Sequence, residues 1–232
     1  MQCLVGTSGY NFEGWKGVFY PADLPASRWL SYYAQRLPTV EINYTFYRIP
    51  NSKTLEGWDA QVPEHFRFAL KASQRITHRT KLQDAESTAY FCDKVKSLQG
   101  KLGPTLVQLP PTFRKDAERL RTFLASLAPH IRPALEFRHK SWFDDEIRQI
   151  LTEARAALCI AEDEDLQCPL WATSTEGYVR LRLQEYSAAA LRDWADRIKA
   201  QPWERCFIYF KHEDAAQGVG LADQLKALLP AG

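Results

Sequence analysis

Two glutamates, Glu41 and Glu136, lie inside short, otherwise apolar segments of the sequence. An unpaired charge buried in such a segment would be costly, so both carboxylates are expected to have cationic partners. A carboxylate held among cations can act as a general acid or base, because neighbouring charges and burial set its pKa. Glu41 and Glu136 are therefore the predicted catalytic residues.

Other polar side chains at the ends of apolar segments are candidates for binding an anionic group. Arginine binds a carboxylate or phosphate as a fork, and lysine binds it as a point charge. The alternative for each residue is that it simply marks where the chain reaches water, and the two arginines of segment 178–183 could instead extend between strands and helices. The predicted substrate-binding residues are Thr7, Tyr10, Asn43, Lys71, Gln108, Arg138, Arg180, Arg182 and Lys211.

The elements that must position these residues follow from the pattern of apolar residues. Short apolar or β-branched runs predict strands at 3–6, 40–46, 67–71, 105–109, 133–137, 157–161, 178–183 and 206–210. Apolar residues three and four apart predict helices at 26–37, 52–62, 84–98, 116–127, 144–154, 188–199 and 220–229. The segment 167–174 is polar and interrupted by proline, which predicts an irregular connection between the sixth and seventh strands.

Eight strands alternating with about seven helices predict a (β/α)₈ TIM barrel formed by a single domain, residues 1–232. A doubly wound sheet is the alternative, since both folds repeat the same βα unit. Functional side chains of such a barrel cluster at the C-terminal ends of its strands. We therefore expect the predicted residues to meet around one opening.

Composition restricts the class of protein. The 232 residues are 45% hydrophobic and 25% charged, as in soluble globular proteins, and the net charge of +2 indicates no general affinity for polyanions. No apolar stretch is long enough to span a membrane, and the N-terminal residues do not resemble a signal peptide. Five scattered cysteines favour reduced thiols, so we expect a cytoplasmic protein.

Sequence motifs for cofactors and metals are absent. There is no dinucleotide fingerprint, Walker lysine pattern or zinc-protease motif, so no cofactor is predicted. A divalent cation at Glu162 and Asp163 is the remaining metal option, whereas His212 and Glu213 are adjacent and would point to opposite faces of an extended chain. The aromatic segment 9–25 is expected to pack as a lid over the barrel.

The sequence also resembles a known family, the YecE-like proteins, also called domain of unknown function 72. The resemblance runs from end to end and is carried by GTSGYNFEGWKGVFYP, VEINYTFYRIP, FRFALKASQRITH, LGPTLVQLPPTF, LEFRHKSW, YVRLRLQEYS and FIYFKHEDAAQG. It implies a TIM barrel and no established activity. The motif positions that it suggests are Thr7, Tyr10, Trp15, Glu41, Asn43, Phe46, Tyr47, Lys71, Gln108, Glu136, Arg138 and Arg180.

Two departures place the chain in a variant subgroup of that family. Many members have histidine and glycine after the YVRL segment, where this chain has Arg182 and Leu183. Many also end the last strand with an asparagine pair, where this chain has Lys211, His212 and Glu213. Both departures fall at the expected opening of the barrel, so a ligand is not transferred from other members.

Three functions remain open. The first is an acid/base enzyme, of hydrolase or lyase type, that acts on a small anionic or phosphorylated ligand. The second is a protein that binds or processes nucleic acid, which the basic segment 71–81 favours and the acidic segment 162–165 opposes. The third is a non-catalytic binding protein. The oligomeric state is not predicted.

Overall fold

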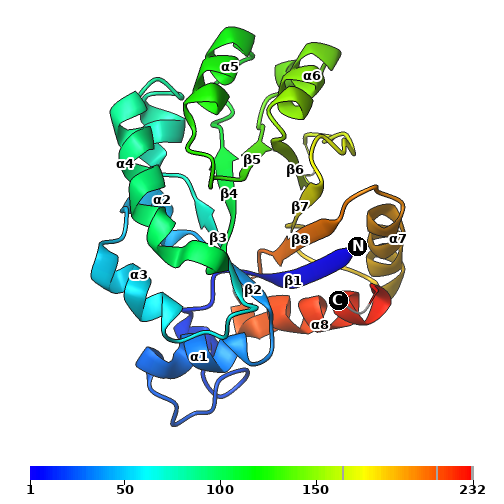
Figure 1. The fold of residues 1–232 in the computed structure, drawn as a ribbon. Helices are drawn as coiled ribbons and strands as arrows, with labels where there is room; N and C mark the ends of the chain where they lie inside the picture. The colour runs from blue at the N-terminus through cyan, green and yellow to red at the C-terminus, as the bar shows by residue number, and fades with distance from the viewer. Residues whose placement is uncertain (164, 213, 231–232) are drawn as a thin grey trace.

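The computed structural model describes residues 1–163, 165–212 and 214–230, in which eight parallel strands close into a barrel in sequence order (Figure 1). The predicted TIM barrel is therefore confirmed. The strands are β1 (Gln2–Ser8), β2 (Thr39–Ile42), β3 (Arg67–Lys71), β4 (Leu102–Gln108), β5 (Pro133–Glu136), β6 (Ala157–Ala161), β7 (Glu176–Leu181) and β8 (Arg205–Phe210).

Helices cover the outside of the barrel (Figure 1). Asp84, Asp116 and Asp144 each precede a helix and accept a hydrogen bond from the backbone amide three residues on, which satisfies a free donor of the first turn. Between β6 and β7 the described residues contain no helix, as predicted. The helices are α1 (Trp29–Ala34), α2 (Tyr44–Tyr47), α3 (Ser52–Asp59), α4 (Ala85–Val95), α5 (Ala117–Ser126), α6 (Asp145–Glu153), α7 (Ala188–Lys199) and α8 (Gln217–Leu228).

The second strand differs from its prediction. It ends at Ile42, and the next residues form the short helix α2 rather than continuing the strand to residue 46. The aromatic and β-branched residues of this segment favour a strand locally. The Thr45 hydroxyl instead donates hydrogen bonds to the backbone carbonyls of Ile42 and Lys71, which turn the chain across the end of β3.

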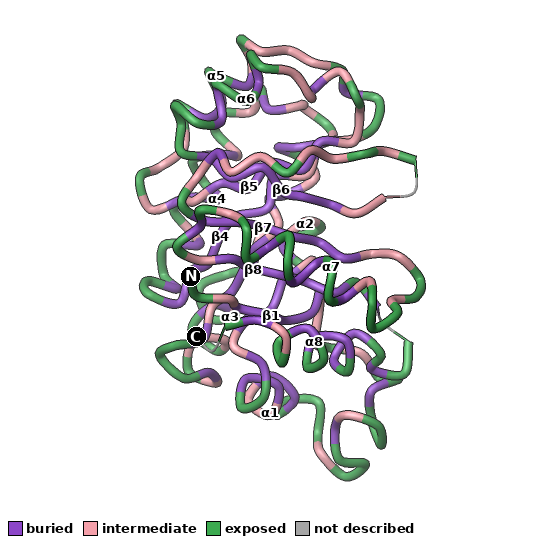
Figure 2. Tube along the Cα trace, turned by 90° about the vertical axis from the view of Figure 1, so that its right-hand side faces the viewer, coloured by how far each residue is buried: buried purple, intermediate pink, exposed green. Residues whose placement is uncertain are grey.

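The barrel interior is filled in layers. Small and apolar side chains such as Ala69, Leu106 and Ala134 occupy it together with the rings of Tyr178 and Tyr209, which are fully buried. Figure 2 shows the strands as the buried centre of the molecule, with exposed segments on the surrounding helices and loops. Charged side chains also enter this interior, and they belong to the candidate site.

The aromatic segment after β1, expected as a lid, packs against helix α1 outside the barrel, while its Tyr10 and Phe12 reach the mouth. Trp15 and Tyr20 are at most 1% exposed, and the Tyr20 ring stacks on Trp29 with 4.9 Å between ring centroids. Gly9 adopts a φ of +106°, and a Cβ there would lie 2.6 Å from the Phe12 ring, so this turn requires glycine. Among the described residues, none of the helices is long and apolar enough to cross a lipid bilayer.

Candidate functional site

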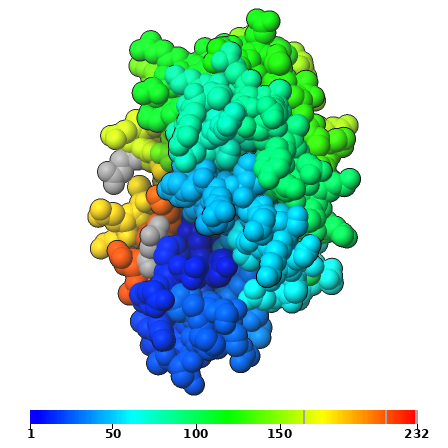
Figure 3. All heavy atoms as spheres, turned by 90° about the vertical axis from the view of Figure 1, so that its left-hand side faces the viewer, coloured from blue at the N-terminus to red at the C-terminus, as the bar shows by residue number. Residues whose placement is uncertain are grey.

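A cavity of about 460 Å³ opens at the C-terminal ends of the strands. Its walls come from segments far apart in sequence, and Figure 3 shows two of them side by side, the dark-blue N-terminal loop and the lighter-blue residues around α2. Seven of the nine predicted substrate-binding residues line it: Tyr10, Asn43, Lys71, Gln108, Arg138, Arg180 and Lys211.

The cavity floor rests on a buried ion-pair cluster. Arg180 on β7 donates hydrogen bonds to Glu41 on β2 at 2.9 Å and to Glu136 on β5 at 2.6 Å. The two glutamates are fully buried and Arg180 is 2% exposed. One guanidinium fork thus neutralises both carboxylates, which explains how the apolar strands accommodate them.

Glu136 has two further partners. The Gln108 side-chain amide donates to it at 2.9 Å, and the Arg138 guanidinium forms an ion pair with it. Burial alone would raise the pKa of Glu136, but the positive charges of Arg180 and Arg138 outweigh burial and lower this pKa to about 2. Glu136 is therefore ionised at neutral pH.

Glu41 is held by two residues outside the predicted set. The Ser8 hydroxyl donates to it at 2.5 Å, and the Tyr178 hydroxyl donates at 2.7 Å. Asn43 in turn donates to Ser8 at 2.8 Å. Tyr178 could have been found from its position two residues before Arg180, which places both side chains on one face of the strand. Ser8 lies beside Glu41 because the two residues are partners in the register of β1 and β2.

The remaining two predicted binding residues lie outside the cavity lining. Arg182 forms an ion pair with Asp163, and its Nε donates to the backbone carbonyl of Glu162 at 3.1 Å. Thr7 is buried, and its hydroxyl donates to the Gly9 carbonyl at 2.7 Å and lies 2.8 Å from the Tyr33 hydroxyl. Both side chains position neighbouring segments of the mouth.

The arginines of the mouth form one continuous network with carboxylates. Arg138 links Glu136 to Asp163, with 3.2 Å between its Nη1 and the carboxylate of Asp163. Asp163 also pairs with Arg182, so each arginine has at least one carboxylate partner. We call this set the arginine network: Glu41, Glu136, Asp163, Arg138, Arg180 and Arg182.

The two lysines of the cavity, Lys71 and Lys211, have no such partner. Within the described ranges, neither ammonium lies within 4.0 Å of a carboxylate. The Lys71 ammonium lies 4.2 Å from the centroid of the Phe46 ring, a cation–π contact. Burial, followed by the charge of Arg180, lowers the pKa of Lys71 to about 8 despite the opposing effect of the two glutamates.

The two carboxylates of the remaining metal option, Glu162 and Asp163, have partners within the protein. The described part of the chain contains no group of three His, Cys, Asp or Glu side chains arranged to hold an ion. Glu162 accepts hydrogen bonds from Trp194 and Tyr186, and Asp163 belongs to the arginine network. Glu213, and Glu164 of the acidic segment, lie outside the described residues.

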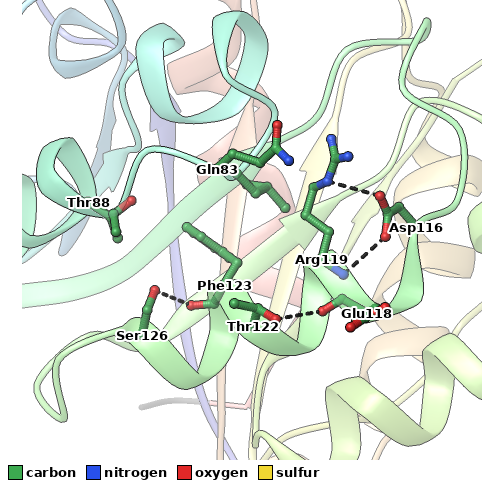
Figure 4. Close-up of a pocket in the computed structure, with 10 residues that line it drawn as sticks. Gln83, Thr88, Asp116, Glu118, Arg119, Thr122, Phe123 and Ser126 are labelled. Atoms are coloured by element: carbon green, nitrogen blue, oxygen red, sulfur yellow. Dashed lines mark hydrogen bonds and ion pairs between the residues drawn. The ribbon is translucent and has the colours of Figure 1, made fainter.

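Two neighbouring cavities differ from this one. A second cavity of about 460 Å³ shares Gln108 and Arg138 with the first and includes His78 and Asp163. A third, of about 440 Å³, lies on the outside of the barrel beside α4 and α5 (Figure 4). Several polar groups of this third cavity already bond to neighbouring residues, as Arg119 does to Asp116, so they are less available to a ligand.

The basic segment 71–81 divides into two parts. Lys71 turns into the mouth, whereas Arg75, at the start of a π-helical turn, pairs with Asp84 at 2.6 Å. The outer basic residues share one surface cavity with two acidic residues: it is bordered by Arg75, Arg79, Lys81, Asp84 and Glu86. Lys71 is thus separated from the other basic residues, and acidic groups lie among those.

The fold and the cavity define a TIM-barrel protein with a cation-lined opening at the C-terminal end of its strands. The chain belongs to the family described as "Protein of unknown function DUF72", which matches residues 4–232. The similarity to the YecE-like proteins is thereby confirmed at the level of the family.

Individual relatives agree with this assignment. The UPF0759 protein YunF of Bacillus subtilis (strain 168) is 29% identical over 148 residues, which cover 60% of this chain and 51% of YunF. The matched part thus spans about half the length of this curated relative.

Two solved structures share the fold. A DUF72 family protein of Thermotoga maritima MSB8 has a TM-score of 0.85 and 24% identity, over 98% of this chain and 99% of that one. One from Enterococcus faecalis V583 has a TM-score of 0.81 and 20% identity, over 98% and 95%.

Proposed function

We propose that this protein binds a small molecule carrying a carboxylate or phosphate group in the cavity at the mouth of the barrel. The observation that supports it is the sign of the charges: every Lys, Arg, Asp or Glu side chain among the described lining residues is a cation. These cations are Lys71, Arg138, Arg180 and Lys211.

The carboxylates that neutralise the arginines lie beneath the cavity or to one side of it. Glu41 and Glu136 are fully buried, and Asp163 lines the neighbouring cavity. The lysines keep an uncompensated positive charge within the described residues, which an incoming anion can neutralise. Each of the Asn43 and Gln108 amides has a second N–H available for the same ligand.

The size of the cavity favours a small ligand over a polymer. Pockets for small molecules are about 300–1,000 Å³, and this one is about 460 Å³. In this proposal, Glu41 and Glu136 serve to hold Arg180 in place.

Isothermal titration calorimetry with inorganic phosphate and with pyruvate, at low ionic strength, tests the proposal. We expect Lys211→Gln to weaken binding about tenfold, because it removes one charge-assisted hydrogen bond. Lys226→Gln, an exposed lysine on α8, is the matched control and should bind as the wild type does.

Binding of neither anion, or binding that Lys211→Gln leaves unchanged, would overturn the proposal. Tight binding of a single-stranded oligonucleotide that weakens steeply with salt, without competition from phosphate, would support the nucleic-acid alternative instead.

A further inference from the structure

We propose that Lys71 is a nucleophile that forms an imine with the carbonyl group of a small anionic ligand. This inference rests on the proposed function and extends it, because it adds a second recognition element to the anion site. The substrate class is then a carbonyl compound that also carries a carboxylate or phosphate group.

The position of Lys71 supports this role. Lys71 is the last residue of β3, at the end of the barrel where the cavity opens, and it lines that cavity. Its ammonium lies over the Phe46 ring at 4.2 Å from the centroid. In the described part of the chain, no carboxylate lies within ion-pairing distance of the ammonium and no acceptor forms a hydrogen bond with it.

Two other lysines of this protein form the hydrogen bonds and ion pairs that are typical of a structural role. Lys101 is almost fully buried, and its ammonium donates to the carbonyls of Asp59 and Val62 at 2.9 and 3.1 Å, with the Asp59 carboxylate at 3.2 Å. Lys115 pairs with Asp144 and Glu146. Acceptors hold the protons of both amines. Lys71 instead lines an open cavity, and among the described residues its ammonium contacts the aromatic face of Phe46.

Burial, more than the surrounding charges, favours loss of the Lys71 proton. Arg180 and Lys211 lower its pKa, Glu41 and Glu136 raise it, and burial is the largest effect, so that the pKa is about 8. His78 packs edge-on against Phe46, and burial and the charge of Lys71 lower its own pKa, so it adds little positive charge. A substantial fraction of Lys71 is therefore the neutral, nucleophilic amine just above neutral pH.

The step balances without a further reactant. The neutral Nζ attacks the carbonyl carbon and forms the C–N bond, while the carbonyl oxygen takes up a proton to give a carbinolamine. The C–O bond then breaks, and the oxygen leaves as water with the two hydrogens that the amine carried. The product is the imine, and no electrons are exchanged with another compound.

The cations of the cavity orient such a ligand. Arg138 and Lys211 line the same cavity as Lys71 and can bind the anionic group while the carbonyl carbon faces Nζ. Holding the two reacting groups together lowers the entropic barrier to the bimolecular step. A neutral carbonyl compound lacks the anchoring group and should react more slowly.

Reductive trapping tests the inference. The protein is incubated with pyruvate, dihydroxyacetone phosphate or acetone in the presence of sodium cyanoborohydride, and the modified lysines are identified by peptide mass spectrometry. We expect both anionic compounds to label Lys71 at least tenfold faster than they label exposed lysines, with acetone slower. Labelling should rise with pH through about 8, and inorganic phosphate should slow it.

Variants at Lys71 and Lys226 serve as controls for the labelling of Lys71. Lys71→Arg retains the charge but lacks the nucleophilic amine, so it should abolish this labelling, and Lys71→Met serves the same purpose if Lys71→Arg fails to fold. Lys226→Gln should be labelled at Lys71 as the wild type is. The wild-type reaction needs no variant, so a folding defect does not prevent the test.

The outcomes separate the two proposals. Normal phosphate binding with no preferential adduct at Lys71 would overturn the imine and leave the anion site intact. Equal labelling by acetone and pyruvate, unaffected by phosphate, would overturn the anionic substrate class together with the proposed function.

Discussion

The two sides of the barrel mouth use positive charge differently. In the arginine network, Arg138, Arg180 and Arg182 are each paired with carboxylates, and the central pairings are buried. Lys71 and Lys211 face the same cavity with no carboxylate partner in the described residues. The difference separates charges that are neutralised within the protein from charges that, in the proposed function, a ligand would neutralise.

The chemistry of the side chains accounts for this division. A guanidinium is planar, always charged, and offers several donors, so Arg180 can satisfy two buried carboxylates at once. A lysine ammonium is a single point charge whose pKa responds to burial and to its neighbours, as that of Lys71 does. Arginine is therefore suited to ion pairs with buried carboxylates, whereas lysine is suited to a site where the side chain gains or loses a proton.

Removing the centre of the arginine network should have the largest effect. Arg180→Met leaves Glu41 and Glu136 buried without their shared cation, and we expect a loss of about 3–5 kcal/mol in the free energy of unfolding. Urea denaturation measures this loss. Adding Glu41→Gln and Glu136→Gln to the same variant should restore most of it. A loss below about 1 kcal/mol would show that these charges are not coupled as described.

Acid should weaken the same network. The folded-state pKa of Glu136 is about 2, below the usual value of 4.5, so its contribution to stability is fully present above the usual value and is lost as pH falls toward 2. The shift corresponds to about 3 kcal/mol. Urea midpoints measured across this range should fall steeply for the wild type and less for Glu136→Gln. Parallel curves for the two proteins would contradict the assignment.

A matched pair of substitutions separates structure from binding. Arg182→Gln removes one partner of Asp163, whose side chain is 23% exposed, so we expect a stability loss of about 1 kcal/mol and unchanged phosphate affinity. Lys211→Gln should change stability by less than about 0.5 kcal/mol and weaken phosphate binding. Chemical denaturation and calorimetry on both variants provide the measurements. Reversed effects would mean that Arg182, and not Lys211, contacts the ligand.

The smallest expected effect concerns the ring beneath Lys71. The Phe46 face stabilises the ammonium, so Phe46→Leu should lower the pKa of Lys71 by about half a unit, the equivalent of a weak cation–π contact. The pH dependence of Lys71 trapping reports this change, with Tyr90→Leu, next to Lys94 on the surface, as the control. A rise in the Lys71 midpoint would exclude a favourable cation–π contact.

Much of the fold was predictable because its signals are local. Apolar runs identified all eight strands, and the bounds of β3 and β6 match the prediction. The strand predicted at 40–46 is wrong in its second half, because the hydrogen bonds of Thr45 to the end of its own strand and to the end of β3 outweigh local β-propensity. The start of β4 was predicted too late. The strand begins at Leu102, and its Gly103 packs so closely on β3 that a Cβ there would lie 2.8 Å from the Phe68 carbonyl oxygen.

Most residues of the candidate site were predictable from the sequence, but the hydrogen bonds that join them were not. Charges inside apolar strands indicated that Glu41 and Glu136 need cations, and the C-terminal strand ends indicated where their partners lie. Ser8 and Tyr178 were missed, because a hydroxyl group in a sequence gives no indication that it donates to a carboxylate on another strand.

By itself, the order of apolar and polar residues determined a barrel whose polar side chains gather at one opening. Only the tertiary structure decided which of these cations pair with carboxylates of the described residues. Arg180 and Arg182 look equivalent in sequence, yet β7 ends at Leu181, so Arg180 enters the barrel and Arg182 turns to Asp163. Ion pairing depends on strand register and on where each strand ends, and closure of the barrel sets both relative to residues far away in the chain.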